Sequence, residues 1–278
     1  MKKILFPTDF SPAANQAFTF ALHLADELQA EIIFLHAYNL MVTGEMLAPA
    51  DFLQSVRDEE ELRSVKEFQA AQQRALQEAH NPIKITPLIR MGFASDVILE
   101  ACDREKPDFI VMGTKGAGNA LETVVGSITT QVMSDCKLPV LAIPENAAFR
   151  GLKRIAYATD FREKDAHISA WIGKLVKGLD AGLVGVHIHP ESEAPLSEEE
   201  IASLTAMYRS DSGISDMSMY VLIDNEIEER LEAFVETQDI HILALARRQR
   251  NFWSRMFDPG LSRRLALHSD KPLLSLPL

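Results

Sequence analysis

The sequence has few cysteines, no long apolar run and a deficit of positive charge, and each absence excludes a class of protein. Its 278 residues include two cysteines, which cannot form the disulfide framework of a small secreted domain. No apolar run reaches membrane-spanning length, and the apolar stretch near the N-terminus is too short for a secretory signal. Lys and Arg number 28 against 40 for Asp and Glu, and the net charge of −12 argues against non-specific nucleic-acid binding. We therefore expect a cytoplasmic protein with reduced thiols that binds neither nucleic acid nor membrane.

Two segments of the chain resemble each other at an offset of 151 residues. Residues 3–10 (KILFPTDF) and residues 154–161 (RIAYATDF) both contain a basic residue, an apolar strand and Thr-Asp-Phe. At the same offset His36 matches His187. Self-similarity of this extent indicates duplication of a whole domain rather than a short repeat.

We predict two domains, residues 1–147 and residues 151–278. Apolar strands and helices alternate along the first of them. This pattern predicts an α/β fold: two tandem, open, five-stranded and mostly parallel sheets with helices on both faces, each a Rossmann-like three-layer sandwich. In the first domain the expected strands are residues 3–7, 31–37, 83–90, 109–112 and 140–143, and the expected helices are residues 12–28, 51–80, 95–105 and 127–135.

Two loops of unusual chemistry follow the first and fourth expected strands. Right-handed crossovers place these two strands side by side, and ligands bind such sheets at that switch point, beyond the C-terminal ends of the strands. Asp9 ends the first strand, and the fourth runs into the glycine-rich segment of residues 108–130 (DFIVMGTKGAGNALETVVGSITT). Where glycines precede a helix, backbone N–H groups and the helix dipole converge on an anion. We therefore expect an anionic ligand between the two strands.

The glycine spacing excludes the common phosphate-binding motifs. A P-loop needs GxxxxGK[ST] after the first strand, where this chain has PTDFSP. The dinucleotide fingerprint needs a third glycine where Leu121 stands, and a pyrophosphatase-type SGGxDS loop is absent.

The spacing that does occur is Gly113-x2-Gly116-x9-Gly126-Ser127. Together with PTD at residues 7–9 and the LPVLAIP strand, it resembles the ATP-binding branch of the universal stress protein (UspA-like) family, in a tandem two-domain form. The resemblance covers the first half of the chain and, more faintly, the second. It implies an adenine-nucleotide α-hydrolase-like sandwich and a bound adenine nucleotide, ATP or else ADP or AMP, with Mg²⁺ bridging the phosphates.

The residue types in the glycine segment suit a nucleotide. Gly113, Gly116 and Gly126 are expected to permit positive φ and to let the backbone approach a phosphate without a Cβ clash. Ser127 and Thr129 offer hydroxyl and N–H groups to phosphates. The alternative is that the glycines only form a connector.

The remaining site residues come from the resemblance. It implies that Thr8, Asp9 and Ala37 line the adenine and ribose end and that Met112 packs against the base. Two alternatives stay open: Asp9 caps the following helix, and Lys115 is solvated rather than bound to phosphate. The predicted binding set, with no catalytic residue and no metal ligand, is Pro7, Thr8, Asp9, Ala37, Met112, Gly113, Lys115, Gly116, Gly126, Ser127, Ile128 and Thr129.

The second domain lacks these glycines. Aligned from Asp239, Ala244 stands in the place of Gly113 and Arg247 in the place of Gly116, so side chains occupy the phosphate space. We therefore expect one nucleotide, bound in the first domain.

Two other features of the second domain have competing interpretations. The arginines within residues 247–264 are either solvated on a scaffold or form a new anion or partner site. His187 and His189 share a strand face and with Asp160 could bind a metal, but the match of His187 to His36 favours a structural role.

The sequence favours a regulatory protein of the stress response over an enzyme, because no nucleophile–base system or carboxylate pair follows from residue spacing. The alternatives are a slow ATPase or autophosphorylating enzyme, with Ser127 or Thr129 as acceptor, and an interaction scaffold that binds no nucleotide. The closing strands, residues 140–143 and 273–276, are apolar edges that need covering. We expect them to pair as an intramolecular pseudo-dimer, and a homodimer is also open.

Overall fold

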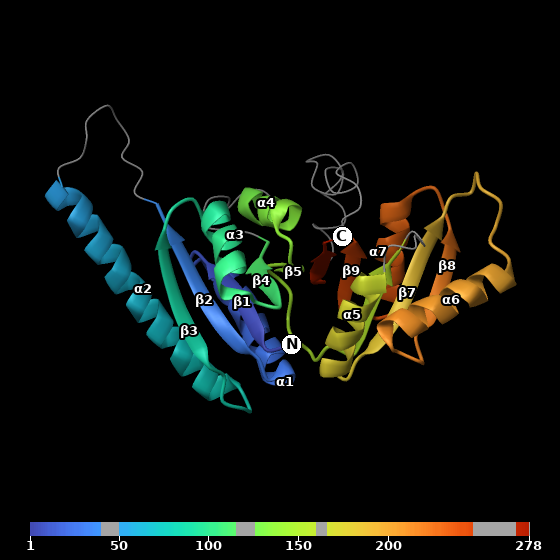
Figure 1. Cartoon of the computed structure of the whole chain (residues 1–278), viewed down its shortest axis with the longest axis horizontal. Helices are drawn as coiled ribbons and strands as arrows, with labels where there is room; N and C mark the ends of the chain where they lie inside the picture. The colour runs from blue at the N-terminus through green and yellow to red at the C-terminus, as the bar shows by residue number, and fades with distance from the viewer. Residues whose placement is uncertain (40–49, 115–125, 160–165, 247–270, 278) are drawn as a thin grey trace.

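Ten strands form one sheet with helices on both faces (Figure 1). The computed structural model describes residues 1–39, 50–114, 126–159, 166–246 and 271–277. The strands are β1 Lys3–Thr8, β2 Glu31–Tyr38, β3 Ile85–Met91, β4 Phe109–Gly113, β5 Val140–Ile143, β6 Arg154–Ala158, β7 Gly182–His189, β8 Ser218–Ile223, β9 Ile242–Ala246 and β10 Leu273–Leu276. The helices are α1 Pro12–Leu28, α2 Ala50–Glu78, α3 Ala94–Glu105, α4 Ser127–Asp135, α5 Ala166–Gly178, α6 Glu198–Ser212 and α7 Ile227–Thr237.

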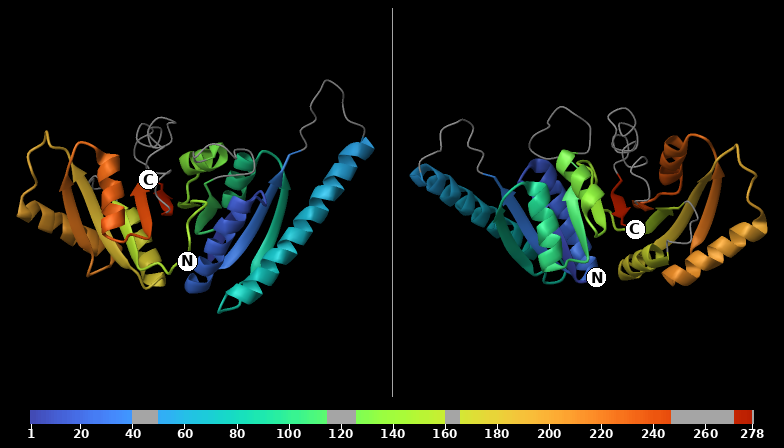
Figure 2. Two further views of the ribbon diagram at one scale, coloured as in Figure 1. Left: turned by 180° about the vertical axis from the view of Figure 1, so that it is seen from behind. Right: turned by 45° about the horizontal axis from the view of Figure 1, so that its top comes forward.

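The strand order is β3-β2-β1-β4-β5-β10-β9-β6-β7-β8. Within each half the neighbouring strands are parallel, which confirms the α/β class and the expected alternation. The halves meet where β10 runs antiparallel to β5, with Leu274 opposite Leu141. The two expected five-stranded sheets are therefore one continuous sheet, and its outer edges are β3 and β8 (Figures 1 and 2).

Local sequence signals set where two of the helices begin. The Ser11 hydroxyl accepts a hydrogen bond from the N–H of Ala14 at 3.1 Å, and Pro12 occupies the first turn of α1. Ser197 caps α6 in the same way and forms a capping box with Glu200. The start of α1 at Pro12 is the one that the sequence predicts, a few residues beyond the end of β1.

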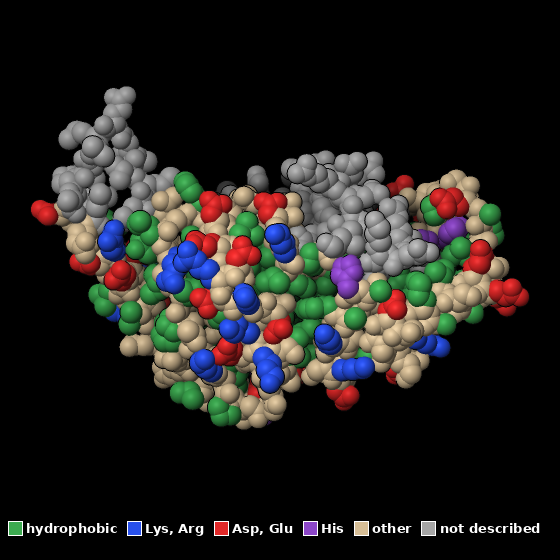
Figure 3. All heavy atoms as spheres, viewed as in Figure 1, with side chains coloured by type: hydrophobic (Ala, Val, Ile, Leu, Met, Phe, Trp, Pro, Cys, Tyr) green, Lys and Arg blue, Asp and Glu red, His purple; other side chains and the backbone are tan. Residues whose placement is uncertain are grey.

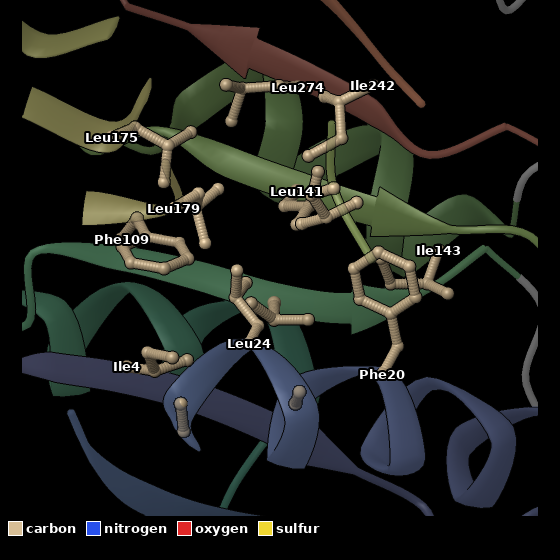
Figure 4. Packing of buried hydrophobic residues seen from close by; sticks show 14 of the residues in the cluster. Ile4, Phe20, Leu24, Phe109, Leu141, Ile143, Leu175, Leu179, Ile242 and Leu274 are labelled. Atoms are coloured by element: carbon tan, nitrogen blue, oxygen red, sulfur yellow. The ribbon is translucent and has the colours of Figure 1, made fainter. Parts of the chain in front are cut away.

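The core lies on both faces of the sheet, and on each face it runs across both halves. Figure 4 shows Leu24 of α1 close to Phe109 of β4 and to Leu179, just beyond α5. The Phe109 ring also meets Trp171 of α5 edge to face, with ring centroids 5.8 Å apart. Because these side chains bury one another across the junction, the two halves share one apolar cluster.

Helices α5 and α6 pack so closely that one position tolerates no side chain. A Cβ atom added to Gly173 of α5 would lie 1.9 Å from the carbonyl oxygen of Ser212, the last residue of α6. Real Cβ contacts of that length do not occur, so this glycine is required by helix packing.

The two cysteines are buried thiols in mutual contact. Cys102 of α3 and Cys136, which ends α4, have sulfur atoms 3.7 Å apart. The hydrogen bond with Cys136 and burial both raise the pKa of the Cys102 thiol, which keeps it protonated. The expectation of reduced core residues agrees with this geometry.

A buried carboxylate fastens the end of α2 to α1. Asp26 accepts hydrogen bonds from the backbone N–H groups of His80 (2.8 Å) and Asn81 (2.9 Å) and from both of their side chains. Burial raises the pKa of Asp26, but the four hydrogen bonds outweigh it and lower the pKa to about 2. The charged form of Asp26 is therefore part of the folded structure.

Acid is expected to weaken this contact. The pKa of Asp26 is lower in the folded state than the ordinary 3.8. Its contribution to the free energy of unfolding is therefore complete above pH 3.8 and is lost as the pH falls toward 2. The contribution is about 1–2 kcal/mol after allowance for solvent screening. Urea unfolding between about pH 6 and about pH 2 measures it. The Asp26→Asn variant should be less stable near neutrality and should show a smaller loss in acid; an equal loss in both proteins would contradict the assignment.

None of the helices in the described ranges combines the length and apolar character needed to cross a bilayer.

Candidate functional site

The predicted site residues converge where β1 and β4 end. The two strands are neighbours in the sheet, with Leu5 opposite Ile110, so that Thr8 and Gly113 lie toward the same edge. β1 continues into α1 and β4 leads toward α4, and the sheet reverses its order between them. This is the switch point at which α/β sheets bind ligands.

The loop after β1 is fixed by its own side chains. The Thr8 hydroxyl accepts a hydrogen bond from the N–H of Phe10, and the Asp9 carboxylate accepts one from the N–H of Ser11, both at 3.0 Å. The cap of α1 is Ser11, so the alternative that Asp9 is the capping residue is wrong. Asp9 is exposed beside the strand end, where a ligand can reach it.

A histidine of β2 holds the same loop from the other side. The Nδ1 atom of His36 lies 2.9 Å from the carbonyl oxygen of Thr8, and that oxygen can only accept, so Nδ1 carries the proton. In the second half His187 makes the equivalent contact with the carbonyl oxygen of Thr159 at 2.8 Å. The structural role predicted for His187 from its match to His36 is confirmed. Sequence reasoning did not give His36 this role, although its recurrence 151 residues later was the available signal.

The first turn of α4 presents N–H groups without a side-chain cap. Gly126 occupies the N-cap position, and no described side chain bonds to the turn; α3 and α7 likewise begin without a side-chain cap, whereas α1 and α6 have one. Its own N–H donates to the carbonyl oxygen of Thr114 at 2.6 Å. The first N–H groups of a helix have no partner within the helix, and none of the described residues bonds to those of Ser127 and Ile128, which is the kind of helix start at which anions bind.

Thr129 ties α4 to the end of β4. Its hydroxyl donates to the carbonyl oxygen of Gly113 at 2.9 Å, and the residue is buried. The expectation that this hydroxyl points at a phosphate is therefore wrong, because its proton is already donated to β4. The bond instead holds the helix start beside the strand end.

At the two motif positions that the structure describes, 113 and 126, the backbone conformation does not require glycine. Gly113 is the last residue of a strand, and Gly126 has φ −60° and ψ 150°. The expectation of positive φ is wrong for both. A Cβ on Gly126 would lie 3.4 Å from the Thr114 carbonyl oxygen, which the protein itself accommodates. Two physical reasons for glycine at residue 126 fit the described part of the chain: glycine is a favoured N-cap residue, and it lets a further group approach the backbone closely.

The other predicted residues occupy different depths. Met112 is buried in the core cluster that includes α3 and α4 residues, Ala37 and Pro7 are half-buried, and Ile128 is exposed. Lys115 and Gly116 lie outside the described residues, so their predicted contacts stay predictions.

In the second half, His189 uses Nε2 in a contact of 2.9 Å with the carbonyl oxygen of Ala194. Among the described residues no group of three His, Cys, Asp or Glu side chains could hold a metal ion. Asp160, Arg247 and the arginines that follow lie outside the described ranges.

Comparison with known proteins agrees with this architecture. The sequence model of the universal stress protein family matches residues 1–144. Universal stress protein Sll1654 of Synechocystis is 32% identical over 143 residues, covering 51% of this chain and 85% of that protein. Universal stress protein MJ0577 of Methanocaldococcus jannaschii is 28% identical over 152 residues, covering 51% of this chain and 94% of that protein.

Similarity to a solved structure extends over both halves. A universal stress protein from Archaeoglobus fulgidus superposes with a TM-score of 0.73 at 20% identity, covering 99% of this chain and 96% of the other. At this identity the match shows the fold, including its tandem arrangement. The family match over more than half of the sequence carries the assignment: this chain belongs to the universal stress protein family.

Proposed function

We propose that the N-terminal half binds ATP at the switch point between β1 and β4, and that the protein acts as a nucleotide-dependent regulator in the stress response. The observation that carries the proposal is the start of α4. Its first turn is uncapped among the described residues, and the cap position is a glycine whose backbone angles suit any residue. An anion that approaches the backbone accounts for both features.

In this proposal, different residues contact the two ends of the nucleotide. The N–H groups of Ser127 and Ile128 face the phosphate end at the start of α4. Asp9, exposed after β1, supplies an acceptor for a ribose hydroxyl or an exocyclic amine. Mg²⁺ would be held by phosphate oxygens and water, which suits a site where the described protein side chains form no metal cluster.

The proposal assigns one nucleotide to each chain. The strand registers place Ala246, the last residue of β9, where the first half has Gly113, the last residue of β4, so the alignment of Ala244 with Gly113 made from the sequence is wrong by two residues. The second half still has a side chain where the first has glycine. The antiparallel contact of β5 with β10 supports a pseudo-dimer in which the second half acts as scaffold for the first. The absence of an apolar spanning helix among the described residues is compatible with the cytoplasmic location that we propose.

Calorimetry with nucleotide-free protein tests the proposal. Titration with ATP and Mg²⁺ should give a stoichiometry of one per chain, and titrations with ADP and AMP rank the nucleotides. No binding heat, together with no protection against thermal unfolding, would contradict it. Release of inorganic phosphate at a steady rate would show turnover, and the regulatory assignment would then give way to an ATPase.

A further inference from the structure

Phe10 lies between Asp9 and the cap residue Ser11, and its backbone conformation is one that a bulky residue disfavours. Its φ is +61°, in the left-handed region, where Cβ crowds the following carbonyl oxygen. Phe10 does not follow a helix but lies at the candidate site. Strained residues persist only where neighbouring contacts hold them, and they cluster at functional sites. Four other described non-glycine residues have positive φ, and each lies one or two residues beyond the end of a helix, where this conformation is common: Gln29, Lys106, Asp180 and Asp239.

Aromatic and cationic contacts hold the side chain of Phe10, which is 9% exposed. Its ring stacks on the imidazole of His36, with ring centroids 4.2 Å apart and an angle of 28° between the planes. The guanidinium of Arg63 lies over the same ring, 5.5 Å from its centroid. Since His36 belongs to β2 and Arg63 to α2, the conformation of the loop after β1 depends on both elements.

The contacts of α2 beside this loop are looser than those at the other end of the helix. The carboxylate oxygens of Glu60 lie 3.8 Å from Nε2 of His36 and 4.0 Å from Nη1 of Arg63, both beyond hydrogen-bond length. Nε2 of His36 is buried and has no hydrogen-bond partner among the described residues. Just beyond the C-terminal end of α2, by contrast, four hydrogen bonds to Asp26 hold the chain. The helix is therefore fixed to α1 at one end and loosely attached beside the site.

The part of α2 that lies beside the site is poorly buried. From residue 54 to residue 63, a range that the structure describes throughout, no side chain is buried. Buried side chains begin at Ser64 and continue with Ala71 and Ala75. Figure 3 shows charged and hydrophobic side chains interspersed at the surface of this end of the molecule. Segments with so little buried surface open locally at low cost, so the contact with Phe10 matters for residues 54–63.

The second half links the corresponding elements by a direct hydrogen bond. The Thr159 hydroxyl, just beyond β6, lies 2.6 Å from the hydroxyl of Tyr208 on α6, and both residues are buried. A link between the end of the first strand and the helix after the second strand thus occurs in both halves. It is short and buried in the second half, and long and partly exposed in the half to which we assign the nucleotide.

We infer that Phe10 couples nucleotide binding at the switch point to the attachment of residues 54–63 of α2. The inference rests on the proposed function. A nucleotide that contacts Thr8 and Asp9 stabilises the loop in its strained conformation, and with it the contact between the Phe10 ring and Arg63. Without the nucleotide, Phe10 relaxes toward negative φ more often, and its ring then leaves Arg63. The helix thus reports whether the site is occupied.

Hydrogen exchange of the full chain, followed by mass spectrometry, tests the coupling. ATP with Mg²⁺ should slow amide exchange across residues 54–63 of the wild type by at least about threefold, because local opening breaks the ring contact that the nucleotide stabilises. Exchange across residues 70–78, at the fixed end of α2, should not change. Phe10→Gly removes both the ring and the backbone strain, so it should abolish the slowing while the chain still binds ATP.

Arg63→Ala tests the same link from the side of the helix. Arg63 is not among the residues expected to bind the nucleotide, yet its loss should weaken ATP binding by about threefold and abolish the slowing, because the coupling is reciprocal. Arg74→Ala is the matched control on the same helix. Arg74 lies over the Phe18 ring at 5.3 Å and bonds to Thr19 and Glu78, so this change removes contacts with α1 rather than with the loop after β1. It should leave ATP affinity and the slowing as in the wild type.

Calorimetry on the same samples separates two kinds of failure. No binding of ATP would contradict the proposed function, and the coupling with it. Binding of ATP with unchanged exchange across residues 54–63 overturns the coupling alone. So does equal slowing in the wild type and in Phe10→Gly, or an equal effect of Arg63→Ala and Arg74→Ala.

Discussion

Gly173→Ala is expected to destabilise the protein by about 3 kcal/mol, although alanine is the better helix former. Helix propensity favours alanine by about 1 kcal/mol at an interior position. The added Cβ would lie 1.9 Å from the carbonyl oxygen of Ser212 and 2.8 Å from its carbonyl carbon. Because these are backbone atoms, no side-chain rotation relieves the clash, and α5 and α6 must separate. Overpacking therefore outweighs propensity.

Gly182→Ala is the matched control for this change. Gly182 begins β7 in the same half, and a Cβ there would meet the carbonyl oxygen of Lys153 at an ordinary 3.6 Å. Its effect should stay within about 0.5 kcal/mol. Chemical unfolding of the two variants, with the same denaturant slope as wild type, decides the comparison. Equal stability of Gly173→Ala and Gly182→Ala would show that α5 and α6 do not pack as described.

Gly126→Leu is expected to weaken ATP binding by about a hundredfold, or roughly 2.7 kcal/mol, while the fold persists. Gly126 has backbone angles open to any residue, and a Cβ atom at this position would contact the Thr114 carbonyl oxygen at 3.4 Å. A longer side chain at the N-cap would occupy the space through which phosphates reach the N–H groups of α4. Calorimetry with ATP measures the loss.

Gly126→Ala distinguishes an effect on ATP binding from an effect on protein stability. Alanine is a poorer N-cap residue than glycine, so a stability loss of up to about 1 kcal/mol is expected without unfolding. ATP affinity should fall between those of wild type and Gly126→Leu, whereas Gly182→Ala should bind as wild type does. Unchanged affinity in Gly126→Leu would remove the start of α4 from the site.

Much of the fold follows from patterns that are local in the sequence. The Ser11-Pro12 pair predicts the first residue of α1, and Ser197 with Glu200 predicts the start of α6. The order of strands and helices follows from apolar runs and their alternation. The 29-residue helix α2 is also recognisable as a polar amphipathic segment, although the structure begins and ends it one or two residues earlier than expected.

Contacts between distant residues were beyond sequence reasoning. Asp26 reads as one polar residue within a helix, and only the fold brings it to His80 and Asn81, more than fifty residues later. The clash that fixes Gly173 likewise depends on how α5 and α6 approach. Both effects arise from tertiary packing, which leaves no periodic trace in the sequence.

The candidate site was predicted in position but not in every atomic role. Glycines that make turns and glycines that admit a ligand are identical in sequence, so positive φ was expected at Gly126 where the structure has −60°. From the sequence the Thr129 hydroxyl could donate to a phosphate or to a backbone carbonyl, and the structure shows it donating to the carbonyl oxygen of Gly113. The meeting of the β1 and β4 ends, by contrast, follows from topology.

The antiparallel contact between β5 and β10 also shapes how this protein can evolve. Two identical subunits joined at such a strand change together, because every substitution appears in both. Here the partners are halves of one polypeptide, so their contact does not depend on protein concentration. A substitution in one half leaves the sequence of the other half unchanged. The second half can thus lose the glycines while His187 still contacts the carbonyl oxygen of Thr159 as His36 contacts that of Thr8 in the first half. Covalent linkage turns a symmetric assembly into one whose members are free to specialise.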